Sequence, residues 1–219
     1  MSVPSGAPKG LDTQRIHEPQ AALLQEERRA TLGLLRSAFL GVSPWDLAEK
    51  LTILAATYSE CEAVAIRLRK GPDFPYAASR GFDDSFIHRE DSLCALDNQG
   101  VVLRNERRQP ILECMCGSVL SGRTDPGSPY FTPAGSFFTQ STTALLEGAV
   151  EEDRRVRTRN RCHQAGYESV GLFPIRLGDN VFGLIQCNDR RRDRFPPEKI
   201  ELLEELAATA AHLFQLSML

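Results

Sequence analysis

The fold is decided by the stretch SVGLFPIRLGDNVFGLIQCN, residues 169–188. Two runs rich in branched and aromatic residues, 169–177 and 181–188, flank a Gly-Asp-Asn turn, which is the pattern of a β-hairpin. Proline has no backbone N–H, so Pro174 predicts a bulge in the first strand or a position at the edge of the sheet. The stretch therefore predicts an antiparallel hairpin in the C-terminal part of the chain.

A second hairpin is predicted far upstream of the first. The run AVAIRL at residues 63–68 has the composition of a strand, and a Gly-Pro-Asp turn follows at residues 71–73. Residues 76–79 would form the returning strand. Two hairpins separated by about 90 residues indicate one antiparallel sheet built from both ends of the chain.

Helices are expected on both sides of this strand pattern. Apolar residues recur near a 3.6-residue period over residues 18–41, whereas residues 1–17 lack periodicity and are expected to be a disordered tail. Ser43 followed by Pro44 is typical of a helix start, because serine caps the helix and proline fits the first turn. The chain closes with an amphipathic pattern that begins at the Pro196-Pro197 pair.

The composition excludes several classes of protein. The chain has 219 residues, 42% hydrophobic and 25% charged, with a formal net charge of −3, so no basic field draws it to nucleic acid or anionic lipid. No run approaches the roughly 20 apolar residues of a membrane span, and residues 1–20 have no apolar secretory core. We therefore expect a cytoplasmic protein with no nucleic-acid or membrane partner.

The segment between the hairpins holds the candidate chemistry. It contains four of the six cysteines, and no charged residue occurs over residues 126–146. A long segment of weak periodicity inside a compact domain is uncommon unless it covers a ligand site. We therefore expect a ligand pocket under this mid-chain segment.

The four mid-chain cysteines are the candidate metal ligands: Cys94, Cys114, Cys116 and Cys162. A reducing cytosol disfavours a disulfide framework, and sets of soft thiolates select zinc or an iron–sulfur cluster. Thiol redox chemistry and inert burial remain alternatives, and haem held by a cysteine or His163 is left open. Cys61 and Cys187 are expected to be core residues.

Longer stretches of the chain resemble one known family. The hairpin GYESVGLFPIRLGDNVFGLIQCNDRR (166–191), together with LECMCG (112–117), GSFFTQSTTALL (135–146) and RTRNRC (157–162), is similar to cysteine-containing GAF domains of bacterial sensor kinases and other signalling proteins. The resemblance covers residues 43–215. It implies an α+β fold with a central antiparallel sheet, helices on one side and a ligand pocket on the other.

The resemblance also implies a function. GAF domains are mostly sensory or regulatory modules, so the chain is expected to act in bacterial signal transduction and to bind a metal or iron–sulfur centre, or a small ligand. The helix over residues 18–41 would support signalling and a homodimer, with a downstream kinase or regulator in trans. An alternative is a thiol-based enzyme similar to free methionine-R-sulfoxide reductase, a GAF-fold protein in which one thiol attacks the sulfoxide and a second resolves it.

Further residues are candidates for binding a small ligand. The uncharged stretch at residues 135–143 mixes rings and hydroxyls, which suits a pocket wall, and capping of the following helix is the alternative. Arg157 and Arg159 would turn inward to an anionic ligand or to the charge of a cluster, unless the basic run is a solvated helix face. The candidate ligand-binding residues are Phe138, Thr139, Thr142, Thr143, Arg157 and Arg159.

Overall fold

The two predicted hairpins join through their inner strands to form the centre of one sheet. A computed structural model describes residues 33, 43–148 and 158–217, and within them the sheet has the order β2-β1-β5-β4-β3, with every neighbouring pair antiparallel. The predicted disordered tail (1–17) and N-terminal helix (18–41) lie outside the described residues, apart from Gly33. The strands are β1 (Ala63–Leu68), β2 (Tyr76–Arg80), β3 (Phe137–Thr139), β4 (Ser169–Leu177) and β5 (Asn180–Asp189).

The central strand β5 divides its side chains between the two faces of the sheet. Ile185 and Cys187 belong to the core on one face, whereas Leu184 belongs to the core on the other, as the two-residue period of a strand requires. Gln186 and Asn188 share the period of Leu184 and are almost fully buried. The sheet therefore separates an apolar face from a face that carries buried polar groups.

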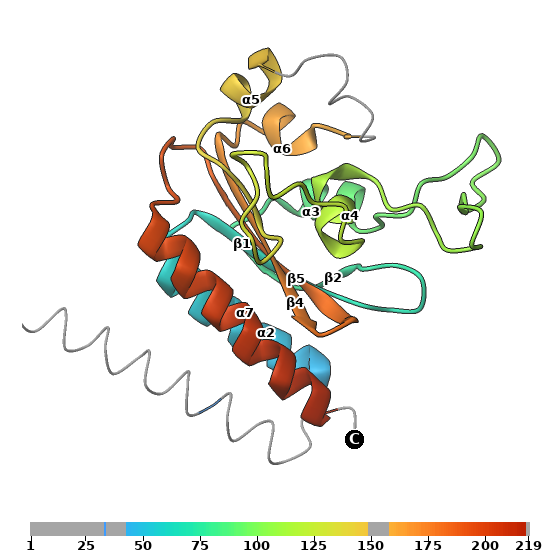
Figure 1. Cartoon of the computed structure of the whole chain (residues 1–219), viewed down its shortest axis with the longest axis horizontal. Coiled ribbons are helices and arrows are strands. Elements are labelled where there is room, and N and C mark those ends of the chain that lie inside the picture. Colours follow the sequence, from blue (N-terminus) through green and yellow to red (C-terminus); the bar gives the residue numbers. More distant parts are fainter. Residues whose placement is uncertain (1–32, 34–42, 149–157, 218–219) are drawn as a thin grey trace, which may run out of the picture.

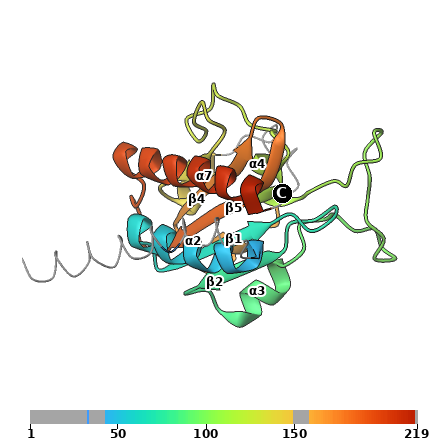
Figure 2. The same ribbon diagram turned by 90° about the horizontal axis from the view of Figure 1, so that it is seen from below.

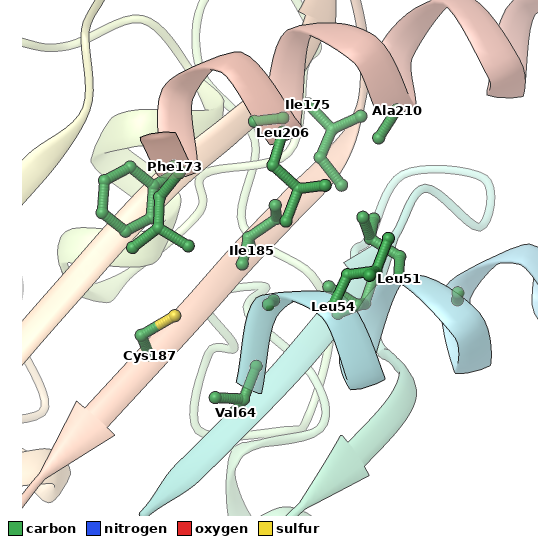
Figure 3. Packing of buried hydrophobic residues seen from close by; sticks show 14 of the residues in the cluster. Leu51, Leu54, Val64, Phe173, Ile175, Ile185, Cys187, Leu206 and Ala210 are labelled. Carbon is green, nitrogen blue, oxygen red and sulfur yellow. The ribbon is translucent and has the colours of Figure 1, made fainter. Parts of the chain in front are cut away.

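The two long helices cover the apolar face side by side (Figures 1 and 2). They are α2 (Pro44–Ser59), which begins as predicted with the Asp46 N–H donating to the Ser43 hydroxyl, and α7 (Pro197–Ser217). Leu51 and Leu54 of α2 and Leu206 and Ala210 of α7 pack against the sheet (Figure 3). This layer is the main hydrophobic core.

Four short helices lie across the other face, so helices cover both sides of the sheet (Figure 1). The sequence predicted this region as a long segment of weak periodicity, with a capped helix after residues 135–143 and a helical basic run as alternatives. Part of it, residues 94–112, folds back on itself through isolated bridges into an arm that extends from the body (Figure 2). The short helices are α3 (Asp84–Glu90), α4 (Cys114–Leu120), α5 (Thr142–Gly148) and α6 (Arg161–Gln164).

The structure supports two sequence predictions about single positions. Beyond Leu172, β4 has no β3 partner, so Pro174 lies where one side of the strand needs no ladder hydrogen bond. Cys61 and Cys187 are buried in the core under α2 and α7, as expected.

No helix among the described residues is long and apolar enough to cross a membrane.

The close pairing of β1 and β5 requires glycine at position 183. A Cβ added to Gly183 would lie 2.0 Å from the backbone carbonyl oxygen of Arg67, and backbone cannot yield as a flexible side chain can. We expect Gly183→Ala to lower the free energy of unfolding by about 2 kcal/mol or more, measured by urea denaturation. Gly178→Ala, whose Cβ meets nothing within 4 Å, should cost only the strain of its positive φ, about 1 kcal/mol. Equal losses in the two variants would contradict this account.

Candidate functional site

Three of the four candidate cysteines lie together on the polar face of the sheet. The Cys116 thiol lies 3.9 Å from the Oε1 atom of Gln186, and the Nε2 atom of the same amide lies 3.9 Å from Cys162 Sγ. Cys114 lines the same cavity as the other two cysteines. We call Cys114, Cys116 and Cys162 the cysteine group. It joins α4 to α6 above the central strand.

The cysteine group lines a small cavity of about 70 Å³. Thr139 and Thr142 contribute hydroxyls to its wall, and Phe137, Val170 and Leu172 contribute apolar surface. His163 also lines the cavity, and its Nδ1 atom lies 3.0 Å from the Thr142 hydroxyl. The cavity has room for about one or two water molecules or a single ion, and not for a nucleotide-sized molecule.

Cys94 lies apart from this group. Its Sγ atom lies 3.9 Å from the Pro72 carbonyl oxygen, beneath the turn between β1 and β2. Burial and then the nearby Asp73 carboxylate raise the pKa of its thiol to about 11. The structure therefore brings together three of the four predicted metal ligands and leaves Cys94 in a structural position.

Burial favours the neutral form of two thiols of the cysteine group, those of Cys116 and Cys162. Burial, and then the charge of Cys114, raise the pKa of Cys162 to about 12 and that of Cys116 well above its ordinary value. Cys114 and Cys162 are half-buried, whereas Cys116 is buried. A buried thiol becomes a thiolate readily only when a cation or a metal compensates its charge.

Buried hydrogen-bond donors lie on the same face of the sheet as the cysteine group. Arg67 is 1% exposed, and its guanidinium donates to the carbonyl oxygens of Phe74, Glu90 and Asp91. Its Nε atom and the Nδ2 atom of Asn188 are buried without a hydrogen-bond partner in the described part of the chain. The side chain of Asn188 lies close enough to Cys162 to lower the pKa of its thiol, against the effect of burial. Because an unpaired buried donor costs free energy, these donors favour the thiolate form and oppose the larger effect of burial.

These polar groups were not predicted, although the sequence carries a signal for them. Arg67 interrupts the apolar run of β1, and Gln186 and Asn188 interrupt that of β5 with a spacing of two. Polar residues at that spacing in an otherwise apolar strand share one face. Such a face either meets water or, as here, lies buried against other polar groups.

An ion-pair network holds the covering helices over the site. Arg159 donates to the Glu113 carboxylate at 3.0 Å and to the carbonyl oxygens of Ser92 and Cys94. Glu90, which is 4% exposed, pairs with Arg159 and, at 3.0 Å, with Arg161. Glu113 precedes Cys114 and Arg161 precedes Cys162, so the network fixes both segments that carry the cysteine group.

The predicted ligand-binding residues therefore have different environments. Thr139 and Thr142 line the cavity, as predicted, but Phe138 packs toward the core under α2 and α7. Thr143 donates its hydroxyl to Glu168 at 2.6 Å instead. Arg159 is committed to the contacts described above, and Arg157 lies outside the described residues. The capping alternative also holds, because Ser141 accepts the Ala144 N–H at the start of α5.

The described residues (33, 43–148 and 158–217) include no group of three or more His, Cys, Asp or Glu side chains placed to hold a metal ion. The three thiols of the cysteine group are neighbours, but their sulfur atoms do not meet at one point. A metal centre at this place stays a prediction.

Comparison with known proteins identifies the fold family. The GAF domain model matches residues 46–213, which is most of the chain. The chain belongs to the GAF domain family. Its antiparallel sheet, with the two long helices on one face and a cavity on the other, has the α+β architecture expected from the resemblance, and short helices additionally cover the cavity face. Family membership supports a sensory or regulatory role. No curated protein sequence matches the chain.

Solved structures share the GAF fold at low sequence identity. The GAF domain of an Acinetobacter phosphoenolpyruvate-protein phosphotransferase superposes with a TM-score of 0.53 and 14% identity, covering 88% of this chain and 92% of that one. A domain assigned to a two-component sensor histidine kinase of Sinorhizobium meliloti 1021 gives 0.50 and 13%, covering 79% and 91%. The GAF domain of the cyanobacteriochrome TePixJ gives 0.50 and 12%, covering 81% and 92%. At this identity the likeness extends to the fold alone.

The helix beside the cavity, α5, depends on one carboxylate. Hydrogen bonds from Thr143 and Ser141 lower the pKa of the Glu168 carboxyl to about 2. Its stabilising contribution is therefore present above the ordinary glutamate pKa, near 4.3, and is lost as the pH falls from there toward 2. We expect Glu168→Gln to lower the melting temperature at pH 7 and to have little effect near pH 2, in a thermal unfolding series.

The control for this experiment is Glu106→Gln on the exposed arm, which should leave the melting temperature unchanged at every pH. A loss in Glu168→Gln that is the same at pH 7 and near pH 2 would show that the carboxylate charge contributes nothing.

Proposed function

We propose that the chain is a sensory module of bacterial signal transduction whose stimulus acts at the cysteine group. The observation that carries the proposal is that Cys114, Cys116 and Cys162, from two separate segments, line one cavity above the central strand. The proposal is supported by two buried donors on the same face of the sheet, Arg67 Nε and Asn188 Nδ2, which have no hydrogen-bond partner among the described residues. The site is thus suited to a change in the charge or bonding of the sulfur atoms.

A zinc ion or an iron–sulfur cluster is the centre that this donor set would suit. Both prefer thiolate ligands, and His163 could provide a nitrogen ligand from the same cavity wall. The positive charge of Arg67 would partly balance the negative charge of the thiolates, and the amides of Gln186 and Asn188 would donate hydrogen bonds to them. Because the sulfur atoms do not yet meet at one point, binding would require Cys114, Cys116 and Cys162 to rotate toward one another.

The stimulus would reach the outside of the domain through the sheet. Gln186 contacts the cysteine group, whereas Cys187, the next residue of β5, packs under α2 and α7. A shift of β5 therefore acts directly on the two long helices. We propose that these helices pass the signal on within a homodimer to a kinase or regulator in trans. Light scattering, which measures the mass of the particle in solution, would test whether the chain forms this dimer.

A thiol-based enzyme is the second candidate, because neighbouring thiols are also what a sulfoxide reductase needs. One thiol would attack the sulfoxide of free methionine sulfoxide, and a second would form a disulfide with loss of methionine and water. The raised pKa values of Cys116 and Cys162 do not favour fast attack at neutral pH, which leaves the half-buried Cys114 as the attacking group. A thioredoxin-coupled assay tests this candidate.

Metal analysis of anaerobically purified protein tests the sensory proposal. We expect about one equivalent of zinc, or iron with acid-labile sulfide and visible absorption, in the wild-type chain. Substitution of Cys116 or Cys162 by serine should abolish this content, because each removes one of only three neighbouring thiolates. The matched control is Cys94→Ser, which should keep it, because Cys94 lies at the turn between β1 and β2.

Two results would contradict the sensory proposal. A metal-free, colourless wild-type protein would exclude the metal version. If, in addition, oxidation by diamide left Cys114, Cys116 and Cys162 unlinked, the sensory role of the cysteine group would fail altogether.

A further inference from the structure

A second and larger cavity lies between α3 and α6. Its volume is about 570 Å³, within the range of small-molecule sites. Phe86, Arg89 and Glu90 of α3 form one side, and Arg161, Gln164 and Ala165 form the other, with Arg159 between them. Nothing in the proposed role of the cysteine group uses this cavity.

The charges on the wall of this cavity favour an anion. Three arginines line it against one glutamate, and Arg159 is fully engaged with Glu113 and backbone carbonyl oxygens. Glu90 and Glu113 together balance the charges of Arg159 and Arg161, so the positive excess of the wall comes from the third arginine, Arg89. The wall keeps a net positive charge.

The donors that remain available include those of Arg161 and Gln164, which lie on the same helix, α6. Arg161 uses its Nε atom for Glu90, and within the described residues its two terminal nitrogens and the side-chain amide of Gln164 have no acceptor. Arg161 is 38% exposed, so solvent molecules and solutes can reach it. A guanidinium with two free terminal nitrogens matches the two oxygens of a carboxylate or phosphate.

The apolar part of the wall is rigid. Phe86 stacks on Phe82 with ring centroids 5.1 Å apart, and Tyr167 meets both rings edge-on. Phe86 and Ala165 can therefore contact the carbon skeleton of a ligand without repacking. The combination of one apolar side and one cationic side fits a small organic molecule better than an inorganic ion.

We propose that the cavity between α3 and α6 binds a small organic anion, with its carboxylate or phosphate held by Arg161 and Gln164. This site is distinct from the cysteine group, but Arg161 lines both cavities and directly precedes Cys162. The anion is thus a second input to the same module, and its binding does not depend on what the cysteines hold.

Isothermal titration at low ionic strength tests the proposal with two probes. Adenosine 5′-monophosphate carries a phosphate and succinate carries carboxylates, so the pair separates the two kinds of anion. We expect one saturable site per chain for at least one probe. Arg161→Gln should weaken that binding about tenfold or more, and Gln164→Ala about threefold, as loss of a charged and of a neutral hydrogen bond requires.

Two control variants show whether the binding belongs to this cavity. Arg107→Gln removes the same charge from the exposed arm and should leave binding unchanged. Cys116→Ser should also bind the probe normally, so failure of the metal proposal would not affect this one. Because Gln164 has no side-chain partner in the described residues, Gln164→Ala should fold even if Arg161→Gln does not, as circular dichroism would verify.

Absence of saturable binding for both probes would overturn the proposal. So would affinity that is equal in the wild type, Arg161→Gln and Gln164→Ala, because the anion would then bind elsewhere.

Discussion

The amide of Gln186 is the contact on which the arrangement of this domain depends. It lies on the central strand, faces away from the two long helices, and contacts the thiols of Cys116 and Cys162 through its two ends. Tyr76 donates its hydroxyl to the same amide oxygen at 3.1 Å. A single side chain thereby connects the sheet with α4 and with α6. Consecutive side chains of a strand point to opposite faces, so Cys187, the next residue of β5, packs on the other face under α2 and α7 (Figure 3).

The sheet and the long helices could be predicted because local signals determine them. Turn residues at 71–73 and 178–180 define the hairpins, and Ser43 with Pro44 defines a helix start. These features depend on neighbours in sequence, so the amino-acid sequence contains what is needed. The family resemblance rests on the same stretches.

The face that carries the site was harder to predict because its contacts are long-range. Helices α3 and α4 have seven residues each, too few for a clear period, and the surrounding structure stabilises them. Cys94 and Cys114 looked equivalent in sequence, yet one lies at a turn and the other above the sheet. Arg159 was expected to meet a ligand, but it instead pairs with Glu113, 46 residues away. Contacts between residues so far apart in sequence form only in the folded chain, so a local sequence pattern does not reveal them.

Two cavities of different chemical character lie on one face of the sheet and share one ion-pair network. The smaller one is lined by thiols and backed by buried donors, whereas the larger one is cationic and opens beside Arg161. Glu90 and its arginine partners lie between them. A chemical change at either cavity would shift the charge balance of this shared network. Only a difference in affinity between two conformations could turn that shift into a signal.

Thiol cross-linking tests most directly whether the cysteines meet in the folded chain. The reduced, folded protein would be treated with dibromobimane, which bridges only neighbouring thiols, and the bridged peptides would be mapped by mass spectrometry. We expect bridges within the group of Cys114, Cys116 and Cys162, including one that joins α4 to Cys162. Bridges from Cys94 to Cys162, or none between α4 and α6, would contradict the proposed meeting of these thiols.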